Sequence, residues 1–264
     1  MVIVLKVFRF FIIISCLFVQ ACQHNSKNDS IPESHKNKDL SKAASFNIQL
    51  GLGYLKQGDR PRAKKKLLTA MQQEPKSPDV NAAMAYYFEQ TNELDQSRKY
   101  YLKAISLSSN GGAQLNNYGT FLCRQGEYKK AETYFLNAVK DEHYVNTAAA
   151  YENAGLCALA VPDNDKAKLY FTTALNQDPS RKTSLYEFAK LESKEGHDEN
   201  ALALLQKHSD LVLNDKIFLS LAKDIASKAG KYEIAAQYEN SLKKMEPHTD
   251  NSGVVNNEYN TLNG

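Results

Sequence analysis

Residues 115–138, LNNYGTFLCRQGEYKKAETYFLNA, contain the clearest structural pattern in this chain. Apolar and small residues recur at helical spacing in its first half, and they do so again in its second half. Between the halves, Gly126 can adopt the positive φ with which many helices end. The stretch therefore predicts two helices joined by a tight turn.

The same pattern recurs along most of the chain. A small residue of the second helix marks each copy, at successive intervals of 34, 34, 36, 34 and 34 residues: Ala63, Ser97, Ala131, Ala167, Ala201 and Ala235. A large apolar residue follows four positions later in the first five copies. A period near 34 is typical of stacked helix–turn–helix repeats. Each such repeat contacts mainly its neighbours, and the stack builds an extended binding surface.

These copies resemble the tetratricopeptide repeat, which has small residues where helices cross, Gly at the turn and Pro near the end. The first, third and fourth copies match best, and the fifth is weakest because His208 stands where Ala is expected. Gly119 is acceptable inside a helix if another helix approaches closely there. An irregular helical bundle is the alternative, but six matches in register disfavour it. We expect an all-α superhelical solenoid of about six repeats, forming one domain over residues 42–248.

Composition and motifs exclude several classes of function. The six histidines are scattered, and none has the spacing of a metal-binding motif. The sequence has no Gly-rich phosphate loop and no nucleophile elbow. No run of Lys and Arg is accompanied by aromatic residues, and we interpret Lys64–Lys66 as a solvated outer face rather than a lipid-headgroup patch. We therefore expect no enzymatic activity, metal, cofactor, small-molecule substrate or nucleic-acid partner.

The N-terminal residues 1–21 have the pattern of a lipoprotein signal peptide. Lys6 and Arg9 precede an apolar core at residues 10–19, which is too short for a permanent membrane span. An uncleaved anchor is the alternative. Residues 22–41 are polar without apolar periodicity and are expected to form a flexible tether. The Asn-rich residues 249–264 are expected to form a disordered tail.

The end of that segment, Val19-Gln20-Ala21-Cys22, resembles the bacterial lipobox. The resemblance implies that the Cys22 thiol carries a diacylglycerol and that the chain is cut before it. Cys16 heads a competing match, but its apolar core would be too short. Asp after the cysteine favours the inner membrane in such lipoproteins, so Gln23 implies the outer membrane. We expect a lipid-anchored protein whose solenoid faces the periplasm.

Two cysteines remain in the repeats once Cys16 and Cys22 are set aside. Cys123 and Cys157 are 34 residues apart, in the first helices of the third and fourth copies. First helices of neighbouring repeats lie side by side, and a compartment outside the cytoplasm favours disulfides. A two-residue insertion places the cysteines at different repeat positions. We therefore predict a disulfide, with two buried and reduced cysteines as the alternative.

The inner groove of the solenoid is the predicted binding site. In tetratricopeptide repeats it is lined by fixed positions of each first helix, and here those positions mix apolar and polar residues. Such a surface suits an extended or helical peptide segment. The candidate partner-binding residues are Ile48, Leu52, Leu55, Tyr86, Glu89, Asn116, Thr120, Arg124 and Glu152.

The signal, the lipobox, six repeats and the two cysteines together resemble the PilF/PilW family of type IV pilus biogenesis and stability lipoproteins. The most specific local resemblances are LNNYGTFLC at residues 115–123 and YENAGLC at residues 151–157. The resemblance implies a pilotin, which helps the secretin of the type IV pilus system to reach the outer membrane and multimerise, and which supports pilus stability. The alternatives are an adaptor of outer-membrane β-barrel assembly or peptidoglycan synthesis and a regulatory scaffold.

Overall fold

The computed structural model describes residues 33–245, with side chains placed from Asp39 onward. This part of the chain contains thirteen helices and no strand. The helices are α2 (Glu33–Lys56), α3 (Arg60–Gln73), α4 (Pro78–Gln90), α5 (Leu94–Leu107), α6 (Gly112–Arg124), α7 (Tyr128–Ala138), α8 (Thr147–Ala160), α9 (Asn164–Gln177), α10 (Lys182–Lys194), α11 (Asp198–Lys207), α12 (Ser209–Val212), α13 (Lys216–Lys228) and α14 (Tyr232–Lys244).

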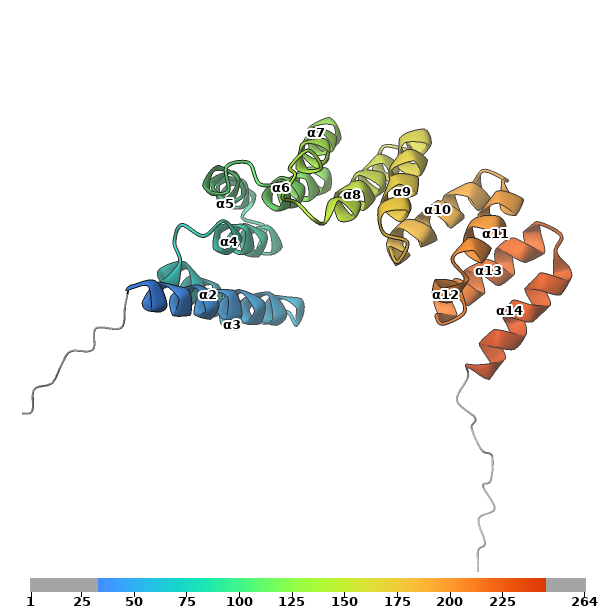
Figure 1. Cartoon of the computed structure of the whole chain (residues 1–264), viewed down its shortest axis with the longest axis horizontal. Coiled ribbons are helices and arrows are strands. Elements are labelled where there is room, and N and C mark those ends of the chain that lie inside the picture. The colour runs from blue at the N-terminus through green and yellow to red at the C-terminus, as the bar shows by residue number, and fades with distance from the viewer. Residues whose placement is uncertain (1–32, 246–264) are drawn as a thin grey trace, which may run out of the picture.

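Apart from the single-turn helix α12, the helices form consecutive antiparallel pairs. The pairs are α2 with α3, α4 with α5, α6 with α7, α8 with α9, α10 with α11, and α13 with α14. They follow one another along an arch, and its two ends turn toward the same side (Figure 1). The predicted all-α solenoid of about six repeats is confirmed.

The third pair shows how the sequence produces one repeat. At the turn Gly126 has φ +77°, and its N–H donates to the carbonyl of Cys123 at 3.0 Å. Inside α6, a Cβ built on Gly119 would lie 2.8 Å from the ring of Phe135 in α7. The predicted close approach of the two helices is therefore real, and Gly119 permits it.

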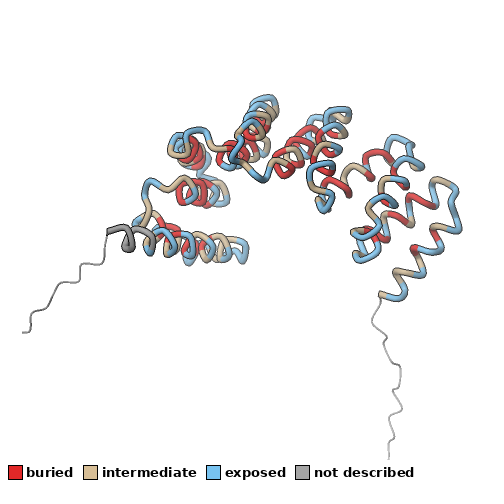
Figure 2. Tube along the Cα trace, in the orientation of Figure 1, coloured by how far each residue is buried: buried red, intermediate tan, exposed pale blue. Residues whose placement is uncertain are grey.

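The core runs along the stack between the helices, where the buried stretches of the chain face their neighbours (Figure 2). The small residues that mark the repeats are buried, and Ala63, Ala131, Ala167 and Ala201 have no exposed surface. Each leaves room for two helices to cross, while Phe135 and similar large side chains fill the space beside it.

Helix α2 corrects the predicted extent of the tether. The helix begins at Glu33, so residues 33–41 are helical rather than flexible. These residues include no Gly or Pro, and a helix fixed by packing at Ala44 extends easily through such a segment. The predicted signal, Cys22, the rest of the tether and the tail at residues 249–264 lie outside the described residues.

The fifth repeat departs from the others, as its weak sequence match suggests. Helix α11 ends at Lys207, and the short helix α12 follows His208. Val212 of α12 is buried and packs in the cluster that joins the last repeats. The bulk of a partly buried imidazole at the position of the usual Ala accompanies this early end of the second helix.

Candidate functional site

A cavity of about 460 Å³ lies along the first helices of the first four repeats. Its lining comes from α2, α4, α6 and α8, with one side chain from α5. Six of the nine predicted groove residues are among those that line it. The lining residues are Ile48, Leu52, Asp79, Ala82, Ala83, Tyr86, Tyr101, Asn116, Asn117, Thr120, Arg124 and Asn153.

The part of this cavity formed by α2 and α4 is apolar except for Asp79. Ile48 and Leu52 of α2 face Ala82 and Tyr86 of α4 across it. Tyr86 is 37% exposed, whereas its neighbour Tyr87 is only 5% exposed. An aliphatic or aromatic side chain of a partner could therefore bury apolar surface here, which is a favourable contribution to binding.

The other end is built from amides. Asn153 of α8 donates from Nδ2 to Oδ1 of Asn116 of α6 at 3.0 Å. Thr120 donates its hydroxyl to the backbone carbonyl of Asn116 at 2.9 Å, which holds the hydroxyl to its own helix. Asn117 is exposed, and its side chain has no hydrogen bond with the described residues. Amide side chains thus face the groove from two neighbouring repeats.

Arg124, a predicted partner contact, is already held by an acid. Its Nε and Nη2 donate to Oε1 and Oε2 of Glu89 at 2.5 and 2.8 Å. Burial by itself lowers the pKa of Arg124, but the bonds to Glu89 outweigh it and raise the pKa overall. Tyr101 donates to Glu89 at 3.2 Å, and burial together with that negative charge raises the pKa of Tyr101. The guanidinium is therefore neutralised within the protein.

Three predicted groove residues do not line the cavity. Leu55 packs against the core between the first and second repeats. The carboxylate of Glu89 is covered, with 6% of its side chain exposed, because it bonds Arg124 and Tyr101. Glu152 is buried, and it accepts bonds from Ser184 and from Arg181. Glu89 and Glu152 thus have hydrogen-bond partners inside the solenoid, and contact of either residue with a partner protein stays a prediction.

Two further residues, which are not among the predicted groove positions, complete the polar end. Asn117 and Asn153 each lie 14 residues before the small residue that marks their repeat, Ala131 and Ala167. They therefore occupy equivalent places on α6 and α8. Their shared spacing from the marker alanines is the signal in the sequence that could have identified them. Residues in equivalent places of stacked repeats lie in a row along the same surface.

Cys123 of α6 and Cys157 of α8 are joined by a disulfide, with their Cα atoms 5.8 Å apart. The different repeat positions of the two cysteines do not prevent the bond. Cys157 is buried and Cys123 is partly exposed. The bond links the two helices that carry the asparagines of the groove.

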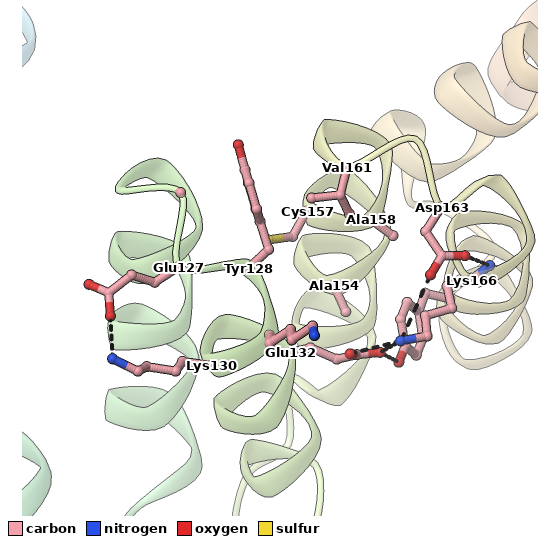
Figure 3. A pocket seen from close by; sticks show the side chains of 13 residues that line it. Glu127, Tyr128, Lys130, Glu132, Ala154, Cys157, Ala158, Val161, Asp163 and Lys166 are labelled. Carbon is pink, nitrogen blue, oxygen red and sulfur yellow. Dashed lines mark hydrogen bonds and ion pairs between the residues drawn. The ribbon is translucent and has the colours of Figure 1, made fainter.

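A second cavity, of about 600 Å³, borders the disulfide. Tyr128 extends beside the sulfur of Cys157, and Ala158 and Val161 continue the apolar wall (Figure 3). Most of the charged residues that surround this wall pair with one another: Lys130 with Glu127, and Lys166 with Glu132 and Asp163. Lys129 also lines the cavity, and its side chain forms no ion pair with the described residues.

Among the described residues, two carboxylates and one imidazole lie close enough together to hold a metal ion. Ligand atoms of Glu192, Glu195 and His197 lie within 4.8 Å of one another, which the sequence spacing did not suggest. The ammonium of Lys168 is 2.7 Å from Glu192 and also pairs with Glu195. The lysine therefore offsets one of the two negative charges and already contacts both carboxylates.

Comparison with known proteins identifies the family. The tetratricopeptide repeat family matches residues 48–111 and 122–182. The type IV pilus assembly protein PilF of Pseudomonas aeruginosa is 35% identical over 158 residues, which are 60% of this chain and 63% of that protein. The match thus spans less than two thirds of that curated relative. The structure from the functional characterisation of Pseudomonas aeruginosa pilF is 31% identical, with a TM-score of 0.62, and the match covers 80% of this chain and 95% of that one. The chain belongs to the PilF/PilW family.

Another member, the widely conserved type IV pilus biogenesis factor PilW, shares the fold. Its crystal structure is 23% identical to this PilF/PilW-family chain, with a TM-score of 0.62, and the match covers 78% of this chain and 95% of that one. In the present chain, no helix within residues 33–245 is both long enough and apolar enough to cross a membrane.

Proposed function

We propose that this protein is a pilotin: an outer-membrane lipoprotein that binds the secretin of the type IV pilus system and assists its outer-membrane localisation and multimerisation. Membership of the PilF/PilW family is the observation that carries this proposal. The protein acts by binding rather than by catalysis, and through the secretin it supports pilus biogenesis and stability.

The groove of the first four repeats supplies the binding part of this function. Its cavity combines an apolar end with a polar end, and the disulfide between Cys123 and Cys157 ties the helices of the polar end together. A site with fixed walls binds a flexible segment with less loss of entropy than a mobile site does. A secretin segment bound there would be prevented from aggregating before the secretin multimer forms.

The lipid on Cys22 supplies the location. The lipobox resemblance at residues 19–22 supports this modification. Each buried methylene contributes about 0.8 kcal/mol, and stable anchoring takes more than one acyl chain. Joining the anchor and the groove in one molecule raises the local concentration of the secretin at the outer membrane.

The test replaces the anchor and leaves the solenoid intact. We expect the Cys22→Ser variant to fold normally and to leave secretin multimers in the inner membrane, whereas Cys16→Ser should behave as the parent if lipid is attached at Cys22. The measurements are circular dichroism, membrane fractionation and the heat-stable secretin multimer on gels. Normal outer-membrane multimers in Cys22→Ser cells would contradict the pilotin role.

Deletion of the gene separates this role from other lipoprotein functions. A pilotin deletion should abolish twitching and surface pili while cell shape and outer-membrane barrels stay normal. Altered cell shape or lost barrel proteins with normal pili would instead favour an adaptor of peptidoglycan synthesis or β-barrel assembly.

A further inference from the structure

The second helices of the first four repeats carry a row of exposed or half-exposed leucines. Leu68 of α3, Leu102 of α5 and Leu136 of α7 each lie five residues after the small residue that marks their repeat. Leu68 and Leu102 are 42% and 44% exposed, and Leu136 is half-buried. In α9, Leu169 lies about one turn before the equivalent place and is 61% exposed. Because equivalent places of stacked repeats lie in a row, these four side chains form an apolar stripe, the leucine row.

The leucine row lies away from the inner groove. None of its four members lines the groove cavity, whose walls come from the first helices and from Tyr101. In the arch, α5, α7 and α9 lie on the outer side of α4, α6 and α8 (Figure 1). Small or polar residues take the corresponding places in the last two repeats: Ala203, Gln206, Gln237 and Asn240. Single exposed leucines are ordinary on a surface, but four that recur on consecutive repeats form a continuous feature.

The helices of the row are strongly basic in the first three repeats. Helices α3, α5 and α7 contain five, three and two Lys or Arg, against one Asp in α5 and one Glu in α7. In α9, α11 and α14 together, five Lys stand against five Asp or Glu. The apolar stripe and the excess of positive charge therefore occur on the same helices.

Three lysines of these helices border the leucine row and are free. Lys64 and Lys65 lie about one turn before Leu68 on α3, and residues at this spacing are neighbours on a helix surface. Lys99 has the same relation to Leu102 on α5. All three lysines are exposed, and they form no ion pair with the described residues. The outer face thus presents an apolar stripe bordered by unpaired positive charge.

We propose that this outer face binds an acidic amphipathic helix of a partner protein, with the apolar side of that helix on the leucine row and its carboxylates beside Lys64, Lys65 and Lys99. An acidic amphipathic helix presents an apolar stripe bordered by negative charge, so it matches the surface in both respects. The inference goes beyond the proposed function, because it assigns a second interaction surface that is separate from the groove.

Two other occupants fit the surface less well. A second copy of this chain, bound symmetrically through the same face, would bring the unpaired lysines close to one another, and like charges in a contact destabilise it. Membrane binding requires an apolar face to enter the bilayer by about 5–10 Å. More than half of Leu68 and of Leu102 is covered by the protein itself, so neither side chain extends that far.

The test uses the full lipoprotein in nanodiscs of zwitterionic lipid and a fluorescent peptide of about 18 residues, or about five helical turns. This probe carries Leu and Glu at the spacing of an amphipathic helix, and a second peptide has Lys in place of Glu. Fluorescence anisotropy should show binding of the acidic peptide and none of the basic one, after subtraction of empty discs. Raising the salt from about 50 to about 500 mM should weaken the binding, because exposed ion pairs are screened.

Charge variants test the lysines. Lys65→Gln/Lys99→Gln should weaken binding of the acidic peptide about threefold to tenfold, since two exposed ion pairs are lost. The control is Lys207→Gln/Lys244→Gln, which removes two exposed lysines from α11 and α14, the second helices of the last two repeats. These lysines also form no ion pair with the described residues, and the control should bind the peptide as the parent does.

An apolar variant tests the leucine row. Leu102→Gln should weaken binding about threefold to tenfold, because apolar surface is lost from the middle of the row. Leu213→Gln is its control, since Leu213 is 48% exposed and follows α12, outside the row. Both variants should keep the melting temperature of the parent. If Leu102→Gln lowers it, the exposed lysine variant decides the outcome.

The inference is overturned if the acidic peptide does not bind, if the lysine variant binds it as the parent does, or if the basic peptide binds equally well. Flotation with phosphatidylglycerol vesicles tests the lipid alternative. Vesicle binding that depends on Lys65 and Lys99, without peptide binding, would assign the face to anionic lipid and overturn the inference. A secretin that fails to bind the parent protein would defeat the pilotin role and leave this surface standing.

Discussion

At the scale of single residues, a glycine opposite a large side chain sets how closely the two helices of a repeat pack. A Cβ on Gly119 would lie 2.8 Å from Phe135, and one on Gly155 would lie 2.6 Å from Phe171. Both rings are fully buried, so they have no space into which they could move. The aromatic ring therefore lies directly on the backbone of the facing helix.

We predict that Gly119→Ala destabilises the protein by about 1–2 kcal/mol, because the overpacking cost of about 1–3 kcal/mol exceeds the gain in helix propensity. Gly53→Ala is the matched control: Gly53 also lies in a helix, but no atom lies within 4 Å of its added Cβ. That variant should be neutral or up to about 1 kcal/mol more stable. Thermal unfolding measures both, and equal melting temperatures for the two variants would refute the explanation.

At the scale of elements, the second helix of the fifth repeat ends beside a residue that departs from the repeat pattern. His208 lies between α11 and α12, where the other well-matched repeats have Ala. Burial, together with the nearby charge of Lys207, lowers the pKa of His208 below its ordinary value. The fold therefore favours the neutral imidazole, and the unfolded chain takes up a proton more readily.

This shift gives a signed pH dependence. Because the folded pKa is below the unfolded value of about 6.5, the stability from neutral His208 is present above that pH and is lost as pH falls through the folded pKa. His208→Ala should therefore lose less stability than the parent between pH 7 and pH 5. Melting temperatures at the two pH values measure the effect. The control is Gln206→Ala, at an exposed position near the end of α11, and it should keep the parental pH dependence. An unchanged dependence in His208→Ala would contradict the prediction.

At the scale of the whole molecule, the arch is held by contacts between neighbouring repeats, and a few of these contacts are polar or covalent bonds. Arg98 of the second repeat bonds Tyr118 and Glu127 of the third, and Glu132 of the third accepts bonds from Lys166 and Tyr170 of the fourth. The disulfide adds a covalent tie between the third and fourth repeats. Because each repeat otherwise touches mainly its neighbours, this tie is expected to stabilise the middle of the stack most.

We predict that reduction of the Cys123–Cys157 bond lowers the melting temperature, since a closed loop of this length contributes roughly 3–4 kcal/mol on a chain-entropy estimate. The Cys123→Ser/Cys157→Ser variant should have the melting temperature of the reduced parent, and reductant should not change that temperature. Thiol counting under denaturing, non-reducing conditions checks the oxidation state. A parent whose melting temperature does not respond to reductant would show that the bond does not stabilise the stack.

The sequence predicted the repeats because their determinants are local. The Gly at a turn, the Ala at a crossing and the aromatic opposite a glycine each act within about 34 residues, so periodicity alone exposes them. It predicted the start of the solenoid less well. Helix α2 extends to Glu33 because a packed helix propagates into flanking residues that carry no strong stop signal.

The repeat pattern is enough to predict a stack of six helical hairpins and the faces of the first helices that turn inward. Which of those inward residues are bound by other parts of the protein depends on the folded molecule. Glu89 and Glu152 have groove positions, yet both are bound by groups of other helices, whereas Asn117 and Asn153 were overlooked and face the cavity. The physical reason is that periodicity fixes the direction of a side chain, while its availability depends on hydrogen-bond partners that distant segments bring to it.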